Sequence, residues 1–225
     1  MKYENPSSVQ AGAIAVSRTS QSGWYPRHGK RAFDLALAIV LLPLLTPVIA
    51  VLWLMARSDG GPGFYGHGRI GRRGVPFKCW KVRSMVLDAD ERLCALLQTD
   101  PAARAQWDRD QKLDNDPRIT RFGHFMRRTS LDELPQIFNV IKGDMSFVGP
   151  RPVVQDELER YGAYKGKYLS LKPGITGLWQ VSGRNDCTYD ERVRFDAEYA
   201  KTVRLHTDVM LIVSTAKTVV YGTGK

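Results

Sequence analysis

The sequence predicts a mostly α protein with a short β element, arranged as a monotopic membrane protein with a re-entrant helix hairpin and a cytoplasmic α/β core. Three observations support this fold class. One apolar segment at 33–56 holds a single charge and two prolines, basic residues flank it on both sides, and a soluble pattern of short elements follows it. We therefore divide the chain into a flexible N-terminal tail at 1–29, a re-entrant membrane anchor at 30–57 and a cytoplasmic domain at 58–225.

The apolar segment is long enough to cross a membrane, but its prolines favour a bent path. As one helix its 24 residues would extend about 36 Å, more than the hydrocarbon core of about 30 Å. Pro43 and Pro47 each remove a helical hydrogen bond, which predicts a kink near Thr46-Pro47. Neither half is long enough to span alone, whereas a hairpin can enter the bilayer and return.

Basic residues on both flanks argue for the same path. Because cytoplasmic loops are enriched in Lys and Arg, both flanks are expected on the cytoplasmic side, which only a re-entrant path allows. A proline-kinked spanning helix is the alternative at this point. The flanking residues are Arg27, Lys30 and Arg31 before the segment, and Arg57, Arg69, Arg72, Arg73 and Lys78 after it.

Beyond the anchor, short elements alternate with turns. A turn-rich stretch at 58–74 precedes a predicted strand at 77–83, in which Lys81 and Arg83 share one face because strand side chains alternate. Helices are predicted at 87–98, 102–112, 130–142, 152–162, 188–203 and 205–221. Asp100-Pro101 supplies a helix start for the second of these, and the last is expected to be a core or membrane-surface helix.

Composition narrows the possible partners. Lys and Arg outnumber Asp and Glu by 33 to 23, and the net charge of +10 favours binding to nucleic acid, an anionic membrane face or phosphorylated small molecules. The cysteines at 79, 94 and 187 are odd in number and lack CxxC spacing. This pattern argues against a disulfide framework or a zinc site and suits a reducing compartment.

The segment RRTSLDELPQIFNVIKGDMSFVGPRP, residues 127–152, concentrates charged groups suited to phosphate chemistry. Ser130 and Glu133 fit a helix capping box, so structural capping is one interpretation of the acids. The neighbouring arginines favour another, in which one carboxylate attacks phosphorus while the other holds a divalent cation. Arg151, between two prolines that restrict its backbone, suits bidentate phosphate contact.

Four ordered blocks resemble one family. KRAFDLALAIVLLPLLTPVI, GRRGVPFKCWKVRSM, the 127–152 segment and KPGITGLWQVSGRN are similar to the bacterial sugar transferases, which are monotopic polyprenyl-phosphate glycosyl-1-phosphate transferases. The likeness runs from about Lys30 to near the C-terminus, and the small exopolysaccharide-initiating members are the most similar. It implies an enzyme at the bacterial inner (cytoplasmic) membrane, with the catalytic domain on the cytoplasmic face, and it favours the re-entrant anchor.

The resemblance also implies roles for single residues. Asp132 matches the family nucleophile, which expels UMP from a UDP-hexose and forms an aspartyl sugar phosphate. Glu133 matches the acid that coordinates Mg²⁺, and the phosphate of undecaprenyl phosphate then accepts the sugar phosphate. Thr46 and Pro47 match the break in the membrane helix. Residues expected to bind substrate or phosphate are Lys81, Arg83, Arg127, Arg151 and Arg184.

Two other functions compete with this reading. The chain could be a basic membrane-surface protein that binds lipid or phosphate without catalysis, although paired acids would repel such a ligand. A metal-dependent hydrolase of diphosphates would form product without a lipid acceptor. We expect no nucleic acid partner, and a homodimer is compatible with the sequence. The donor sugar, glucose or galactose by the family resemblance, is not specified by the residues themselves.

Overall fold

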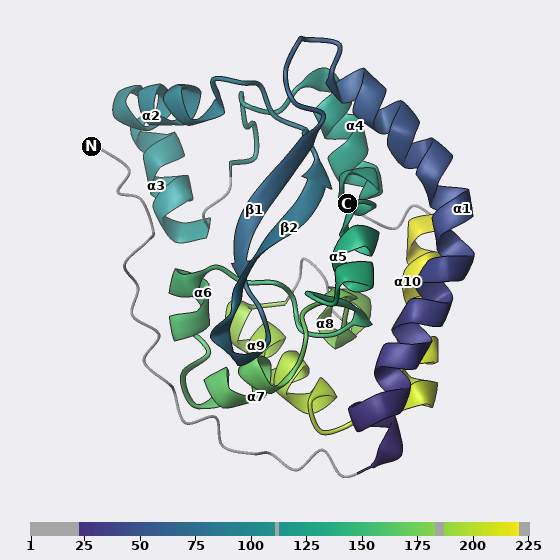
Figure 1. The fold of residues 1–225 in the computed structure, drawn as a ribbon. Coiled ribbons are helices and arrows are strands. Elements are labelled where there is room, and N and C mark those ends of the chain that lie inside the picture. The colour runs from purple at the N-terminus through teal and green to yellow at the C-terminus, as the bar shows by residue number, and fades with distance from the viewer. Residues whose placement is uncertain (1–22, 111–112, 183–186, 221–225) are drawn as a thin grey trace.

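The computed structural model describes residues 23–110, 113–182 and 187–220 of the chain. Figure 1 shows a long N-terminal helix along one side, a β-hairpin beside it, and a group of shorter helices. The longer helices are α1 (Lys30–Ala56), α2 (Ala89–Thr99), α3 (Pro101–Asp110), α4 (Arg121–Thr129), α9 (Tyr189–Tyr199) and α10 (Leu205–Val220). The shorter ones are α5 (Gln136–Lys142), α6 (Gln155–Glu159), α7 (Lys165–Ser170) and α8 (Leu178–Ser182).

The helix α1 is buried most deeply near its two ends, whereas its middle is only partly covered, by contacts of Leu41, Leu42 and Leu45 with the core. Its buried residues are Asp34 and Ala38 near the start and Ile49, Leu52 and Ala56 near the end, and none of residues 39–48 is buried. Figure 1 shows α1 bowed around the body of the protein, as two internal prolines would produce. The two ends of the apolar segment therefore rest on the same domain.

Polar contacts fix the first half of α1. The buried carboxylate of Asp34 accepts hydrogen bonds from the Ser146 hydroxyl and the Phe147 backbone N–H, at 3.0 and 3.1 Å. Arg31 donates to the backbone carbonyls of Val140 and Ile141 at the end of α5. These contacts satisfy buried polar groups that would otherwise be costly, so they specify how α1 lies on the domain.

Part of the segment that was predicted as a flexible tail forms a helical turn. The flexible tail was expected at 1–29, and residues 1–22 lie outside the described residues. Tyr25–Gly29 forms a π-helical turn that continues into α1. The Tyr25 hydroxyl and the Lys30 ammonium both donate to Asp208 of α10 at 2.7 Å, and Tyr199 donates to the other oxygen of that buried carboxylate.

The hairpin positions the site. Strands β1 (Phe64–Ile70) and β2 (Pro76–Val82) pair antiparallel, with Phe64 opposite Val82. Asn139, fully buried on α5, accepts from the Trp80 N–H and donates to the Lys78 carbonyl. The Asn139 side chain thus forms the two hydrogen bonds that a neighbouring strand would otherwise make with the backbone of β2. These bonds attach the hairpin to α5.

A second small sheet closes the core. Strands β3 (Ser146–Val148) and β4 (Gly174–Thr176) pair parallel. A Cβ at Gly174 would lie 2.1 Å from the Gly149 nitrogen, so only glycine permits this approach. The main buried cluster joins α1, β2, α5, β3, α9 and α10 through Ala38, Ile49, Phe77, Cys79, Ile137, Val140, Met145, Phe147, Val148, Tyr199 and Leu211.

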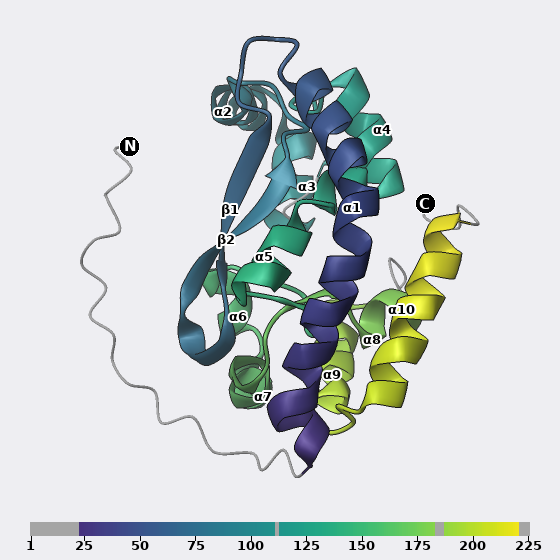
Figure 2. The same ribbon diagram turned by 45° about the vertical axis from the view of Figure 1, so that its right-hand side comes forward.

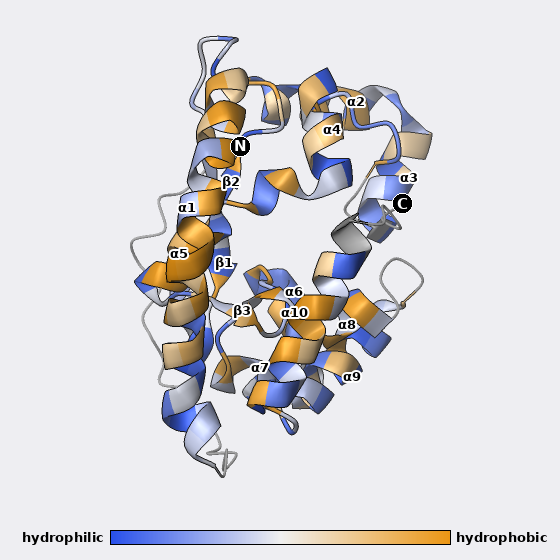
Figure 3. Cartoon of the chain, turned by 90° about the vertical axis from the view of Figure 1, so that its right-hand side faces the viewer, coloured by the Kyte–Doolittle hydropathy of each residue, from blue (hydrophilic) through white to orange (hydrophobic). Residues whose placement is uncertain are grey.

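The helix α10, predicted as a core or membrane-surface helix, has one buried side and several exposed apolar residues. Asp208 and Leu211 are buried, whereas Leu205, Val209, Met210 and Val213 are exposed. Figure 2 shows α10 diverging from α1 toward its C-terminal end, and Figure 3 shows apolar residues along both helices. The two helices thus present apolar side chains to the surroundings while contributing to one core.

Several sequence predictions need correction. The stretch at 58–74 was predicted as turns, yet Phe64–Ile70 forms β1 because it pairs with β2. The helix predicted at 130–142 begins only at Gln136, since Ser130 adopts a left-handed conformation with φ of 57°. The helix predicted at 152–162 is the shorter α6. The α3 start is confirmed, because Asp100 accepts from the backbone N–H groups of residues 102 and 103.

Candidate active site

The two adjacent acids lie on a short 3₁₀ turn between α4 and α5. Leu131–Glu133 forms this turn, and the left-handed Ser130 that precedes it ends α4. The capping box considered for Ser130 and Glu133 is absent, because the Ser130 side chain makes no cap hydrogen bond and Glu133 bonds elsewhere. Structural capping therefore does not explain this acid pair.

Lys81 of β2 bridges the pair. Its ammonium donates to Glu133 Oε1 at 2.7 Å and lies 3.9 Å from Asp132 Oδ2. Asp132 is buried, whereas Glu133 is about one third exposed. Lys81, which was predicted as a substrate or phosphate contact, thus lies beside both acids, and the Asn139 contacts to β2 hold its strand in place.

Burial and charge act differently on the two acids. Burial raises the pKa of Asp132 to about 6, although Lys81 and Arg127 oppose the shift. Burial also opposes ionisation of Glu133, but there the ion pair with Lys81 prevails and the pKa lies below its usual range. Two neighbouring carboxylates with separated pKa values are typical of groups with different tasks.

Two predicted arginines contribute positive charge near the pair. Arg127 Nε donates to the Ser84 hydroxyl at 2.9 Å, and its charge lowers the pKa of Asp132. Arg151 lies 5.7 Å from the centre of the Trp179 ring, and its charge lowers the pKa of Glu133. The arrangement combines a buried carboxylate with cations that can offset phosphate charge.

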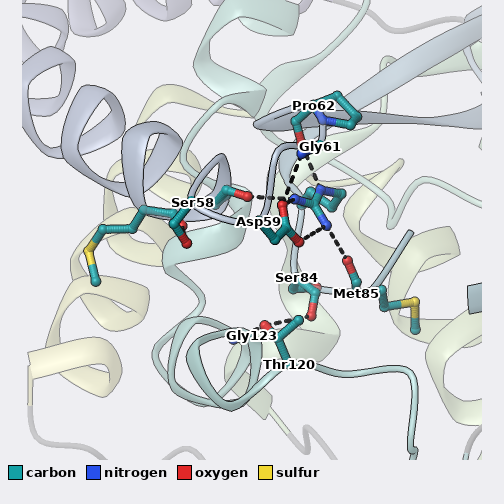
Figure 4. A network of polar contacts seen from close by, with 11 residues as sticks. Ser58, Asp59, Gly61, Pro62, Ser84, Met85, Thr120 and Gly123 are labelled. Atoms are coloured by element: carbon teal, nitrogen blue, oxygen red, sulfur yellow. Dashed lines mark hydrogen bonds and ion pairs between the residues drawn. The ribbon is translucent and has the colours of Figure 1, made fainter. Parts of the chain in front are cut away.

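Arg83 is placed in a different set of contacts. Its guanidinium donates to the carbonyls of Ala56, Pro62 and Met85 and pairs with both oxygens of Asp59. Figure 4 shows Asp59, Pro62 and Met85 converging at this point. The structure therefore does not bring Arg83 to the acid pair but uses it to close the C-terminal end of α1, where carbonyls lack helical partners.

Sequence reasoning missed Ser84, which links Arg127 and the start of α4 to the segment that follows β2. Ser84 accepts from Arg127 through its hydroxyl, and its carbonyl accepts from the backbone N–H of Thr120. A Cβ at Gly123 would lie 2.0 Å from that carbonyl, so α4 can approach only with glycine there. Figure 4 shows Ser84 beside Thr120 and Gly123. The block KVRSM contained the signal, since it places Lys81, Arg83 and Ser84 on one short segment.

The remaining predicted residues are accounted for as follows. Arg184 lies outside the described residues. The Thr46 hydroxyl donates to the Leu42 carbonyl at 2.7 Å. The carbonyls that Pro43 and Pro47 leave without an N–H partner are those four residues earlier, at 39 and 43. Thr46 is therefore bonded within the helix, but not to either carbonyl that the prolines release.

The acid pair suits a hard divalent cation with a phosphate ligand. In the described ranges there is no group of three His, Cys, Asp or Glu side chains able to hold a metal. Mg²⁺ commonly binds through one or two carboxylates together with substrate phosphates and water. Asp132 and Glu133 offer such carboxylates beside a lysine, so they fit a cation that arrives with a phosphorylated ligand.

Comparison with known proteins decides the family. The family model described as bacterial sugar transferase matches residues 25–222. The chain belongs to this family. This bacterial sugar transferase is 56% identical over 193 residues to the undecaprenyl-phosphate galactose phosphotransferase of Salmonella typhimurium, covering 86% of the chain and 40% of that relative.

Two further relatives differ in length. The UDP-galactose-lipid carrier transferase of Erwinia amylovora is 55% identical over 84% of the chain and 40% of its own length. The exopolysaccharide production protein ExoY of Sinorhizobium fredii is 47% identical over 87% of each chain. The bacterial sugar transferase thus spans less than half of the first two relatives and most of the third.

Proposed function

We propose that this chain transfers a hexose 1-phosphate from a UDP-hexose to undecaprenyl phosphate and thereby initiates assembly of an exopolysaccharide or another glycoconjugate. The observation that carries the proposal is the buried Asp132 carboxylate beside Glu133 and Lys81. The printed names of relatives that act on undecaprenyl phosphate and UDP-galactose support the substrate classes. A basic surface that only binds phosphate has no need for two adjacent acids, whose charge would repel its ligand.

Asp132 is the proposed nucleophile. Its carboxylate oxygen attacks the phosphorus that bears the sugar, the bond from that phosphorus to the UMP oxygen breaks, and UMP leaves with the electron pair. An oxygen of the lipid phosphate then attacks the same phosphorus, which releases Asp132 and gives the polyprenyl diphosphate sugar. With a pKa of about 6, about nine in ten Asp132 side chains are ionised at pH 7.

The cations near the acid pair have distinct tasks. Lys81 keeps Glu133 ionised and lies within reach of the Asp132 oxygen, so it can contact the phosphate that approaches between them. Arg127 and Arg151 add positive charge that offsets the charge on the transferring group. We assign Mg²⁺ to Glu133 together with the donor diphosphate, where it would neutralise developing negative charge.

The same proposal includes a monotopic position at the cytoplasmic membrane. The helix from Tyr25 to Ala56 is long and apolar enough to cross a membrane by length and composition. However, Arg31 at one end and Ala56 at the other both bond to the same domain. A crossing helix would separate these contacts, whereas a re-entrant path keeps them, with the exposed side chains of 39–48 in the lipid and the domain on the cytoplasmic face.

The proposal is tested with the full chain in nanodiscs. We expect UMP release from UDP-galactose or UDP-glucose and appearance of the labelled sugar in undecaprenyl phosphate. Without the lipid acceptor, a hexose phosphate adduct should accumulate on Asp132 and be detected by peptide mass measurement. Asp132→Asn should abolish both signals, while Asp156→Asn, which removes an exposed carboxylate on α6, should retain them.

Each failure has a separate meaning. Turnover that persists in Asp132→Asn rejects the nucleophile. Product without a lipid acceptor and without an adduct indicates a hydrolase. Absence of UMP release with every UDP-sugar, from protein that still binds vesicles, favours a lipid- or phosphate-binding protein.

A further inference from the structure

The outer face of α4 holds a basic pocket that the proposed reaction does not use. The pocket has a volume of about 400 Å³ and is lined by Arg121, His124, Phe125 and Arg128. These positions follow the spacing i, i+3, i+4 and i+7, which places them on one face of the helix. All four residues are exposed, whereas Gly123 and Met126 on the opposite face are buried. We call this feature the α4 pocket.

The pocket cations have no partners in the described part of the chain. No ion pair or side-chain hydrogen bond among the described residues involves Arg121, His124 or Arg128, whereas Arg92 and Arg104 on α2 and α3 pair with acids four residues away. The segment 117–130 contains no acidic residue. The pocket is therefore a concentrated positive surface ready to receive an anion.

Helix stability does not account for this arrangement. A cation near the C-terminal end of a helix is favourable, which would explain Arg128. Arg121 occupies the first turn of α4, where the helix dipole opposes a cation, and no acid accompanies it there. An unfavourable charge retained next to a pocket indicates a binding role.

The surroundings identify the anion as part of a lipid. Phe125 is 45% exposed at the pocket. On the buried side of α4, Met126 packs with Leu52 and Ala56 of α1, beside the exposed Leu54 and Met55. Figures 1 and 2 both place α4 beside the C-terminal part of α1. A soluble anion gains nothing from the exposed Phe125 ring, whereas the hydrocarbon chain of a lipid phosphate packs on that ring, on a helix that adjoins the apolar α1.

The α4 pocket also lies close to the acid pair. Asp132 lies four positions after Arg128, so their Cα atoms can be no more than about 14 Å apart. A lipid phosphate held at the near end of the pocket has a short path to the reacting carboxylate. We propose that the α4 pocket binds the phosphate headgroup of a membrane lipid, either the polyprenyl phosphate acceptor or an anionic phospholipid. The acceptor alternative rests on the proposed function.

The test compares two double variants of the full chain. Arg121→Gln with Arg128→Gln removes two pocket cations, and Arg92→Gln with Arg104→Gln removes two surface cations elsewhere. For an acceptor site, the KM for undecaprenyl phosphate in neutral-lipid nanodiscs rises at least tenfold in the first variant, as expected for the loss of two charge-assisted contacts. The acceptor-independent burst of UMP and the KM for the UDP-sugar change less than twofold, and the control resembles wild type.

For a phospholipid site, a different measurement changes. Binding to phosphatidylglycerol vesicles falls at least fivefold in the pocket variant relative to phosphatidylcholine vesicles, while the acceptor KM is unchanged. Unchanged values in both assays, or a loss confined to the UDP-sugar step, overturn the proposal. Arg121→Lys with Arg128→Lys keeps the charges and should restore part of the binding, which separates a misfolded variant from a lost site. If wild type releases no UMP, the proposed function fails and the vesicle assay still tests the pocket.

Discussion

Neutralising Asp132 should raise the stability of the folded protein, whereas neutralising Glu133 should lower it. Burial raises the pKa of Asp132 from 3.8 to about 6, so the folded state binds that proton more tightly than the unfolded state. Ionising Asp132 therefore costs folded stability, with an upper bound of about 3 kcal/mol once the pH exceeds both values. Asp132→Asn removes this cost, and we expect its free energy of unfolding at pH 8 to exceed that of wild type by about 1–3 kcal/mol.

The pH dependence follows from the sign of the shift. The stability linked to protonated Asp132 is complete below the ordinary value of 3.8 and is lost as the pH rises through about 6. The advantage of Asp132→Asn should therefore shrink to about 0.5 kcal/mol at pH 4. Glu133 has a lowered pKa, so its charge stabilises the fold above its ordinary pKa, and Glu133→Gln should be less stable than wild type at pH 8.

The assay is thermal unfolding of the three proteins in one detergent at pH 8 and pH 4. For a chain of this size the expected gain in Tm for Asp132→Asn at pH 8 is roughly 3–9 °C. A lower Tm for Asp132→Asn than for wild type at pH 8, or a higher one for Glu133→Gln, would refute the electrostatic reasoning. The same Asp132→Asn sample should be inactive, which separates stability from catalysis.

Four further outcomes are expected. The single-turnover rate of UMP release should fall about tenfold per pH unit below about 6 and level off above it, because only ionised Asp132 attacks; stopped assays from pH 5 to pH 8 measure this. EDTA should abolish UMP release, and added Mg²⁺ should restore it without a change in the circular dichroism spectrum. Gly123→Ala should lower the free energy of unfolding, measured in urea, by more than about 3 kcal/mol, because the new Cβ would overlap the Ser84 carbonyl. The control Gly166→Ala has open space at its Cβ and should be neutral or stabilising. Arg83→Met should lower Tm by about 5 °C through three lost carbonyl contacts, and an unchanged Tm would show that closing the end of α1 adds no stability.

The sequence predicted those features that depend on local pattern. The apolar length of α1, the strand at 77–83 and the start of α3 follow from residues adjacent in the chain. The strand β1 was missed because its glycines resemble a turn until β2 supplies its hydrogen bonds. Strands β3 and β4 are three residues each and exist only through a pairing across 28 positions, from 146 to 174.

For the site, local pattern could name candidate residues but not the contacts that each of them makes. The family resemblance made Lys81 a candidate, strand alternation placed Arg83 on the same face, and the structure places Lys81 beside the neighbouring acids Asp132 and Glu133. That same alternation suggested a substrate role for Arg83, but a strand face does not reveal that Asp59 and the end of α1 would occupy the guanidinium. The bridging role of Ser84 depends on tertiary contacts with α4 that no local pattern encodes.

The packing of α1 against the domain predicts the effect of truncating the chain at its N-terminus. Ala38, Ile49 and Leu52 belong to the same interior as the hairpin and α5, and Asp34 satisfies groups on β3. Deleting the first 57 residues to obtain a water-soluble fragment would uncover that interior and leave Ser146 and Phe147 without their acceptor. The apolar helix and the acid pair are thus parts of one folding unit, and solubility has to be sought by exchanging exposed residues in 39–48 rather than by truncation.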